Sequence, residues 1–228
     1  SDLISESTKT DLIKRGIEAG QVTVIECGID EDTYSFDPEV KKYENPTALY
    51  LGRIKKYKSV QHLLQAWPFV LEKVPRSRLQ IVGAGDYLEP LKKLADALKI
   101  SDSVEFPGFV SIESKVERFR RSWCTVYPSL KEGWGLTNIE ANACGTPALA
   151  ADSPGLRDSV SPGKSGLLFE YGNITQIADT VLKIFTDQET RDNLSTGARQ
   201  WAQKFNWEDS ARKMMELVEE IVKSNRES

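Results

Sequence analysis

Two glutamates, eight residues apart, lie in the stretch of the chain with the most chemical potential. The segment from Ser129 to Pro147 reads SLKEGWGLTNIEANACGTP, with Glu132 in a glycine-bearing loop and Glu140 inside the helix predicted to follow it. The apolar run WCTVY precedes the loop and is typical of a buried strand. A strand, a glycine loop and a helix start place free backbone N–H groups and the positive end of a helix dipole beyond the strand. Fixed donors for a phosphate, flanked by acceptors for hydroxyls, predict a nucleotide-sugar site.

Two basic residues follow another predicted strand. Residues Thr47–Leu51 read TALYL and indicate a strand, and GRIKKYK comes next. Arg53 stands directly beyond the carboxyl end of this strand, and Lys58 opens the next predicted helix. Arginine offers a planar fork and lysine a point charge, and both suit a pyrophosphate. A solvated basic turn is the alternative, and the position above the sheet favours the phosphate interpretation.

Two further turns are weaker candidates. The run LQIVGAGD places Gly83 after a strand, but the third glycine of a dinucleotide fingerprint is missing. We interpret it as a tight turn, with close approach of the backbone to a ligand as the alternative. The run VEFPGFV places Pro107 and Gly108 after a strand, which is typical of a plain turn. The same turn would let the backbone beside Phe109 hold a nucleobase.

The two glutamates also admit other interpretations. Eight residues of helix separate two side chains by about 12 Å, and a loop that doubles back would bring them closer. Spacing therefore does not decide between the carboxylate pair of a hydrolase and two separate ligands. Glutamates on helix surfaces are usually solvated. Glu140, however, lies between Ile139 and Ala141 in a helix expected to pack on the sheet, which favours a ligand for ribose hydroxyls.

Composition excludes several classes of protein. The 228 residues, 39% hydrophobic and 28% charged, are ordinary for a globular domain, and a net charge of -4 gives no support to a nucleic-acid partner. No apolar run is long enough to span a membrane. We expect a cytoplasmic location, or a peripheral position at the inner face of the membrane in a full-length protein. Three dispersed cysteines argue against a disulfide framework, and a single histidine, His62, against a histidine metal site or a Ser-His-Asp triad.

Short strands alternate with helices through the middle of the chain. This alternation predicts an α/β fold with a Rossmann-like, doubly wound and mostly parallel sheet covered by helices on both faces. Ligands bind such sheets at the carboxyl ends of the strands, where the strand order reverses. The expected strands are 47–51, 78–82, 104–106, 123–127, 147–150 and 166–169, and the expected helices are 59–73, 87–98, 111–120, 136–143 and 174–186.

The two ends of the chain have a different organisation. We expect a helix over 1–20, capped by Ser7 or Thr8, a strand over 22–25 and a linker over 30–45. Helices over 189–205 and 207–223 follow the sheet, with a break or cap at Asn206. We expect the last helix to pack on the core, with an uncovered apolar surface and modest self-association as the alternative. These segments divide the chain into 1–45, the end of a preceding domain and a linker; 46–205, the nucleotide-sugar-binding domain; and 206–228, a C-terminal helix.

Together these motifs resemble family 4 of the retaining glycosyltransferases, a group with the two-domain GT-B fold. The elements that match, in the family's order, are LYLGRIKKYKSVQHLLQAW, LQIVGAGD, VEFPGFV, SLKEGWGLTNIEANACGTPALAADSPGLRDSV and GKSGLLFEYGNITQIADTVLKIF. They extend from about residue 47 to residue 185, and the two glutamates with seven residues between them are the family's most specific signature.

The resemblance implies a role for each candidate residue. Arg53 and Lys58 would neutralise the pyrophosphate of the donor, Glu132 would hold hydroxyls of the transferred sugar, and Glu140 would bind the ribose. We therefore expect Glu132, Arg53 and Lys58 to act in catalysis. The other predicted contacts are Gly133, Trp134 and Gly135 for the sugar, Leu136 and Thr137 for the phosphate, Phe109 and Val110 for the base, and Gly83 beside the nucleotide.

Members of the family need neither metal nor cofactor, because cationic side chains and a helix end offset the charge of the leaving nucleotide. The implied donor is a UDP-, GDP- or ADP-sugar. The chain departs from the family at Ser59, where glycine is usual, and at SPGLRD, where Pro154 and Asp158 replace the usual glycine and glutamate. The first departure would shift the turn slightly, and the second bears on the sugar contacts.

The family has a second Rossmann-like domain that binds the acceptor, and only its last helix would be present here, within 1–20. We therefore expect a donor-binding half that binds a nucleoside diphosphate sugar weakly and transfers little or nothing alone. The acceptor, a glycan, lipid or small molecule, would bind through the other domain. The alternative is a non-catalytic nucleotide- or partner-binding module that retains half of the GT-B fold.

Overall fold

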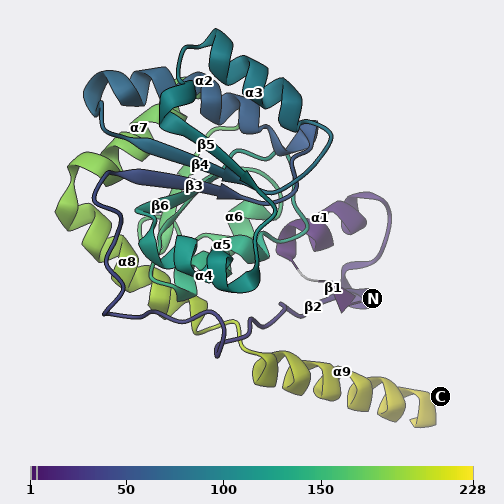
Figure 1. Ribbon diagram of the computed structural model, residues 1–228. Coiled ribbons are helices and arrows are strands. Elements are labelled where there is room, and N and C mark those ends of the chain that lie inside the picture. Colours follow the sequence, from purple (N-terminus) through teal and green to yellow (C-terminus); the bar gives the residue numbers. More distant parts are fainter. Residues whose placement is uncertain (1, 4, 228) are drawn as a thin grey trace.

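A six-stranded parallel sheet lies at the centre of the computed structural model, which describes residues 2–3 and 5–227 (Figure 1). The strand order is β5-β4-β3-β6-β7-β8, so that the chain first builds outward from β3 in one direction and then returns to add β6 on its other side. This is the doubly wound order, and it confirms the predicted fold class. The strands are β3 (Thr47–Leu51), β4 (Arg78–Val82), β5 (Val104–Gly108), β6 (Cys124–Tyr127), β7 (Ala148–Ala151) and β8 (Gly166–Phe169).

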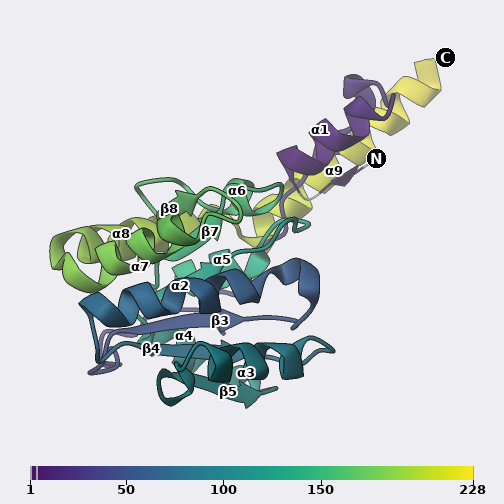
Figure 2. The same ribbon diagram turned by 90° about the horizontal axis from the view of Figure 1, so that it is seen from above.

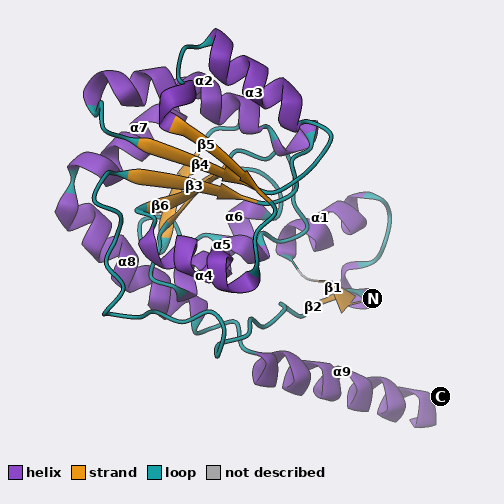
Figure 3. Cartoon of the chain, in the orientation of Figure 1, coloured by secondary structure: helices purple, strands orange, loops and turns teal. Residues whose placement is uncertain are grey.

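Helices cover both faces of this sheet (Figure 2, Figure 3). The helices α2, α3 and α7 pack together on one face, and α4, α5 and α8 pack together on the other. Both faces need cover because the apolar side chains of a strand point alternately to either side. In β3, Ala48 and Tyr50 belong to the core under α2, while Leu49 belongs to the core under α4 and α5. The helices are α2 (Val60–Lys73), α3 (Leu88–Ala97), α4 (Ile112–Arg121), α5 (Leu136–Ala143), α7 (Ile174–Thr186) and α8 (Gln188–Ala202).

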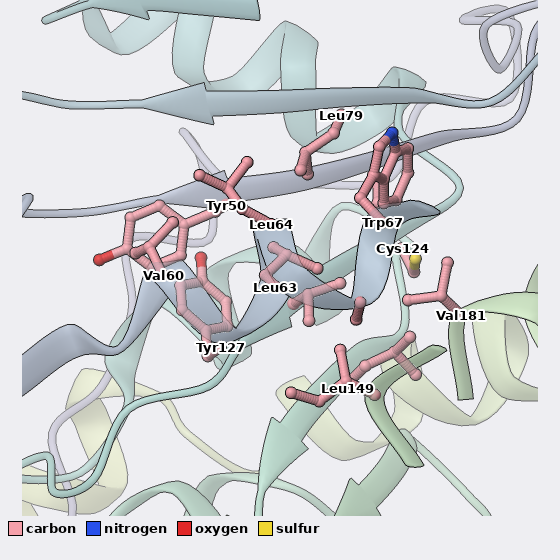
Figure 4. Packing of buried hydrophobic residues seen from close by; sticks show 14 of the residues in the cluster. Tyr50, Val60, Leu63, Leu64, Trp67, Leu79, Cys124, Tyr127, Leu149 and Val181 are labelled. Atoms are coloured by element: carbon pink, nitrogen blue, oxygen red, sulfur yellow. The ribbon is translucent and has the colours of Figure 1, made fainter. Parts of the chain in front are cut away.

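The larger core lies between the sheet and the helices α2 and α7. Trp67 is fully buried there and meets the ring of Phe185 edge-on, with the ring centroids 6.3 Å apart. Leu63, Leu64 and Tyr50 fill the space beside it (Figure 4). Burying each such side chain stabilises the fold by about 1.5–3 kcal/mol. This core holds the loops at the carboxyl ends of the strands on a rigid base.

The N-terminal part is less helical than expected. The helix α1 covers only Glu6–Lys14, because Gly16 takes a left-handed conformation with a φ of 98° just beyond its end. Its N-cap is Ser5, whose hydroxyl accepts from the N–H of Thr8, so the expected cap at Ser7 or Thr8 is wrong. Two short parallel strands flank α1, with a 3₁₀ turn between α1 and the second strand: β1 (Asp2–Leu3), η1 (Ala19–Gln21) and β2 (Thr23–Val24).

Several expected boundaries differ in the sheet domain. Pro107 and Gly108 do not form a turn after a strand but lie in β5, an edge strand, which is where a sheet tolerates proline. Lys58 does not open α2, because it ends a separate 3₁₀ turn. The short elements that no pattern predicted are η2 (Lys56–Lys58), η3 (Ser101–Ser103) and α6 (Leu156–Ser159).

The segment 30–45 is not a free linker. The ammonium group of Lys42 donates to the carbonyl oxygen of Ser122 and to the hydroxyl of Thr146, at 2.8 Å each. The indole N–H of Trp123 donates to the carbonyl oxygen of Tyr43 at 2.9 Å. The segment is therefore bound to the residues that come directly before β6 and β7, at the amino-terminal ends of these strands.

The last helix, α9 (Trp207–Glu227), starts where Asn206 caps it, its side-chain oxygen accepting from the N–H of Asp209. It projects from the sheet domain, and the expectation that it packs on the core is wrong (Figure 2). Lys213 pairs with Glu26 at 2.8 Å, close to the start of the helix. Leu217 is half-buried, whereas the other large apolar side chains in the described part of the helix are exposed: Trp207, Met214, Met215, Val218, Ile221 and Val222. Across residues 2–3 and 5–227, no helix combines the length and the apolar character that crossing a bilayer requires.

Candidate functional site

Arg53, Lys58 and Glu132 lie in loops that meet where the sheet reverses its order. Strands β3 and β6 are parallel neighbours, and the helices that follow them, α2 and α5, leave toward opposite faces. The loops after these two strands therefore meet above the sheet. They are joined by a hydrogen bond from the N–H of Leu130 to the carbonyl oxygen of Tyr57 at 3.2 Å. A reversal point of this kind is where doubly wound sheets bind their ligands.

An ion pair crosses this point. The ammonium group of Lys58 lies 2.6 Å from one carboxylate oxygen of Glu132 and also donates to the other. The two side chains are only 12% and 17% exposed, so the pair is poorly screened by solvent. The lysine predicted for the pyrophosphate and the glutamate predicted for the sugar are thus direct neighbours.

Arg53 is the exposed cation of the site. Its guanidinium group donates to the hydroxyl of Tyr57 at 3.2 Å, and its backbone carbonyl accepts from the buried hydroxyl of Tyr50 at 2.9 Å. In the part of the chain that the structure describes, no carboxylate comes within ion-pair distance of Arg53. The guanidinium group of Arg53 is therefore available to bind a phosphate.

The start of α5 leaves backbone donors free. Gly135 forms the N-cap with a φ of 84°, and no side chain caps the helix. The N–H groups of Leu136 and Thr137 belong to the first turn, where a helix has no acceptor of its own, and they find none among the described residues. They are suited to an anion.

The loop before α5 rests on the segment that departs from the family. The N–H of Glu132 donates to the carbonyl oxygen of Pro154 at 3.0 Å, and a Cβ atom at Gly155 would overlap the backbone of Glu132. Proline at position 154 thus supplies the acceptor that holds the loop, although it has no N–H. Asp158 accepts from the N–H of Ser7 at 3.0 Å and so joins α1 to this region.

A cavity of about 310 Å³ lies beside Glu132. It is enclosed by α1 on one side and by the loop after β6 and the start of α6 on the other. Hydroxyl, carboxylate and cationic groups line it, which suits a polyhydroxylated ligand. The lining includes Thr8, Thr10, Lys131, Glu132, Arg157 and Asp158.

Glu140 is almost fully buried, as its place in the helix predicted. Its carboxylate pairs with the ammonium group of Lys115 at 2.7 Å, and Lys115 also donates to the hydroxyl of Tyr34 at 2.9 Å. Neither partner was predicted, because each lies far from Glu140 in the chain and neither belongs to a motif. The only signal was a lysine on the inward face of a helix, at position 115, followed by Val116 and Phe119 of the core.

The remaining candidates differ in exposure. Phe109 is 88% exposed at the carboxyl end of β5, and Val110 is half-buried beside it. Trp134 is buried against Phe205, so its ring packs and only its backbone faces the loop. The N–H of Gly83 already donates to the carbonyl oxygen of Gly108 at 2.8 Å. Contact of these residues with a ligand stays a prediction.

Comparison with known proteins identifies the family of this chain. The model of the family "Glycosyl transferases group 1" matches residues 32–201. The D-inositol 3-phosphate glycosyltransferase of Corynebacterium jeikeium is 35% identical over 75% of this chain and 43% of its own length. A mannosyltransferase of Mycobacterium tuberculosis, named as GDP-mannose-dependent and acting on phosphatidylinositol monomannoside, is 27% identical over 94% of this chain and 60% of its own length.

Solved structures have the same fold. Sucrose-phosphate synthase from Thermosynechococcus elongatus superposes with a TM-score of 0.87 at 26% identity, over 98% of this chain and 58% of that one. Anabaena HepE, solved with UDP and glucose, gives a TM-score of 0.86 at 22% identity over 96% of this chain and 62% of that one, which shows the fold alone. The chain spans less than two thirds of the length of these relatives. The family match covers most of the chain, and the chain therefore belongs to the group 1 glycosyltransferases.

Proposed function

We propose that this chain is the donor-binding half of a retaining, metal-independent hexosyltransferase. The observation that carries the proposal is the meeting of Arg53, Lys58 and the uncapped start of α5 at the reversal point of the sheet. Two cations and a helix end can stabilise the negative charge that develops on a leaving nucleoside diphosphate. No metal ion is needed for that charge.

The groups proposed for the base and the ribose lie on one side of the site, and those proposed for the hexose lie on the other. The exposed ring of Phe109 and the carboxylate of Glu140 lie on the side of β5 and α4, which suits the base and the ribose. The cavity beside Glu132 lies on the other side and suits the hexose. Relatives whose names include GDP-mannose, and a structure with UDP-glucose, support a GDP- or UDP-hexose as the donor, and the family resemblance also admits an ADP-hexose.

For a retaining transfer, the same residues bear on the choice between double displacement and front-face attack. Both carboxylate oxygens of Glu132 accept from Lys58, so this glutamate is poorly suited to attack the sugar as a nucleophile. We infer that the acceptor attacks the face from which the nucleotide leaves, with assistance from the departing phosphate. The acceptor would be a glycan, a lipid or a small molecule held by a second domain, for which the greater length of the relatives leaves room.

Calorimetric titration of the chain with UDP, GDP, ADP and their hexose esters tests the proposal. One nucleotide is expected to bind with and without EDTA, and Arg53→Ala should weaken it about tenfold or more, the loss of one charge-assisted hydrogen bond. Arg76→Ala, which removes an exposed arginine bound to Glu44 and Asn45, is the matched control and should change nothing.

Three outcomes would contradict parts of the proposal. Binding that EDTA abolishes would refute metal independence. Rapid transfer from the hexose ester to an acceptor by this chain alone would refute its assignment as one half of a site. No affinity for any of the nucleotides, in the wild type and in Arg53→Ala alike, would instead favour a non-catalytic partner-binding module.

A further inference from the structure

Glu140 has two neighbours that the family signature does not contain. Lys115 comes from α4, and its ammonium group lies 2.7 Å from the carboxylate of Glu140. Tyr34 comes from the segment before the sheet, and its hydroxyl accepts from the same ammonium group at 2.9 Å. We propose that Lys115 is a positioning residue for Glu140, that Tyr34 holds Lys115 in place, and that the two together determine recognition of the donor's ribose. The inference rests on the proposed role of Glu140 as the ribose ligand.

Burial makes a partner for Glu140 necessary. Its side chain is 10% exposed and that of Lys115 is 19% exposed. A charge taken out of water is costly unless it is paired and hydrogen-bonded, and Lys115 supplies the counter-charge. A charged carboxylate makes stronger hydrogen bonds to hydroxyls than a neutral acceptor does. Lys115 therefore stabilises the buried carboxylate that would bind the diol.

The count of donors and acceptors leaves room for the ribose. An ammonium group has three donors, and Lys115 uses one on Glu140 and one on Tyr34. A carboxylate has about four acceptor positions, of which Lys115 occupies one and the hydroxyl of Tyr34 a second. Acceptor positions thus remain for the 2′- and 3′-hydroxyls, while the bond to Lys115 fixes the rotation of the carboxylate.

Lys115 is itself held from two sides. Its ammonium group lies 4.9 Å from the ring centroid of Tyr34 and 5.7 Å from that of Phe119, within the range of cation–π attraction. Burial opposes its charge, but the hydrogen bonds to Glu140 and Tyr34 outweigh burial and raise the pKa of Lys115. Burial also raises the pKa of Tyr34, so its hydroxyl stays protonated at neutral pH. The lysine is thus a fixed cation.

The test compares UDP, GDP and ADP with their 2′-deoxy forms by calorimetry, using the nucleotide that binds the wild type most tightly. The wild type should prefer the ribonucleotide about tenfold or more, the worth of one hydrogen bond to a charged group. Lys115→Met should reduce this preference to about threefold or less while binding of the deoxynucleotide changes little, because the phosphate contacts remain. Lys115→Arg, which keeps the charge, should retain most of the preference. Lys93→Met, at an exposed lysine of α3, is the matched control.

Tyr34→Phe gives a second, milder variant that keeps the ring and removes only the hydroxyl. It should lower the preference for the ribonucleotide by about threefold, whereas Tyr43→Phe on the same segment should not. Urea unfolding of each variant checks that the fold is intact.

The possible failures are distinguishable. If the wild type binds no nucleotide, the proposed function fails and this inference fails with it. If it binds ribo- and deoxynucleotides equally, the ribose role of Glu140 and this inference are refuted, while phosphate binding stands. If the wild type discriminates and Lys115→Met discriminates equally well, or loses affinity for both nucleotides to the same extent, only this inference is overturned.

Discussion

Lys58, from the 3₁₀ turn after β3, donates to both carboxylate oxygens of Glu132, from the loop after β6. This ion pair ties together the two strands between which the sheet reverses its order, and it lies across the predicted donor site. We expect the pair to contribute to stability, independently of the binding role proposed for the same two residues.

Lys58→Met and Glu132→Gln should each lower the free energy of unfolding by about 1–3 kcal/mol, because each leaves a poorly solvated charge without its partner. The double variant should lose less than the sum, by about 1 kcal/mol, since it leaves no orphan charge. Urea unfolding of the four proteins measures this coupling. The pair of Lys92 and Glu89 is exposed, and the same cycle there should give less than about 0.5 kcal/mol. Equal couplings at both sites would show that the Lys58 pair is structurally unimportant.

Gly83→Ala should be strongly destabilising. Gly83 has a φ of 139°, and a Cβ atom there would overlap the carbonyl oxygen of Gly52 in the neighbouring loop. We expect a loss of about 2–4 kcal/mol in the free energy of unfolding, from strain and displacement of backbone together. Gly163 has a φ of 74° but open space around it, so Gly163→Ala should lose only about 1 kcal/mol. Similar losses at both positions would mean that the loops after β3 and β4 are not packed together as described.

Ser59 occupies a left-handed conformation, with a φ of 55° and a ψ of 28°, at the position where the family resemblance implies glycine. Its hydroxyl lies 3.1 Å from that of Tyr171. Ser59→Ala should be less stable than Ser59→Gly by about 1 kcal/mol, because alanine keeps the backbone strain and glycine relieves it. Thermal unfolding of the two variants beside the wild type measures the difference. A more stable alanine variant would contradict the left-handed backbone.

Lys42 should make stability depend on pH in the alkaline range. Burial lowers the pKa of Lys42 to about 8, because its partners, the carbonyl of Ser122 and the hydroxyl of Thr146, carry no charge. The unfolded chain, with an ordinary lysine pKa near 10.4, binds more protons than the folded chain between about pH 8 and pH 10. This group's contribution to the free energy of unfolding therefore rises with pH through that window, by an amount on the order of 2–3 kcal/mol.

The measurement is urea unfolding from pH 7.5 to pH 10 for the wild type and for Lys42→Met. Burial raises the pKa of the Cys124 and Cys144 thiols to about 12, which works in the opposite direction, so the difference between the two proteins is the informative quantity. Lys41→Met, at the adjacent exposed lysine, should follow the wild type. Parallel curves for the wild type and Lys42→Met would refute a depressed pKa at Lys42.

Much of the fold was predictable because its signals are local. Each strand of the main sheet is a short apolar run bounded by turn residues, and five of the helices carry an apolar stripe at helical spacing. The prediction of a turn at Pro107 was wrong. Proline has no N–H to donate to a neighbouring strand, so central strands exclude it, but an edge strand such as β5 tolerates it. It also failed for α9, whose apolar residues look like a core stripe although they remain exposed.

The candidate site was predictable only in part. Arg53, Lys58 and Glu132 come together because parallel strands end at one edge of the sheet, and that follows from topology. The pairing of Lys115 with Glu140 does not, since it depends on how α4 and α5 pack side by side. Tyr34 was least accessible to prediction, because it lies in a segment without periodicity that binds to the domain through isolated polar contacts.

The edge strand β5 also bears on how this protein behaves in solution at high concentration. An exposed strand edge is a template for strands of other molecules, and such pairing starts aggregation. Here Pro107 offers no N–H group, Glu105 places a charge along the edge, and the pairing with β4 is interrupted by a shift in register between Gln80 and Val82. These features discourage the addition of a seventh strand, so that any association between copies is expected to use surfaces other than this end of the sheet.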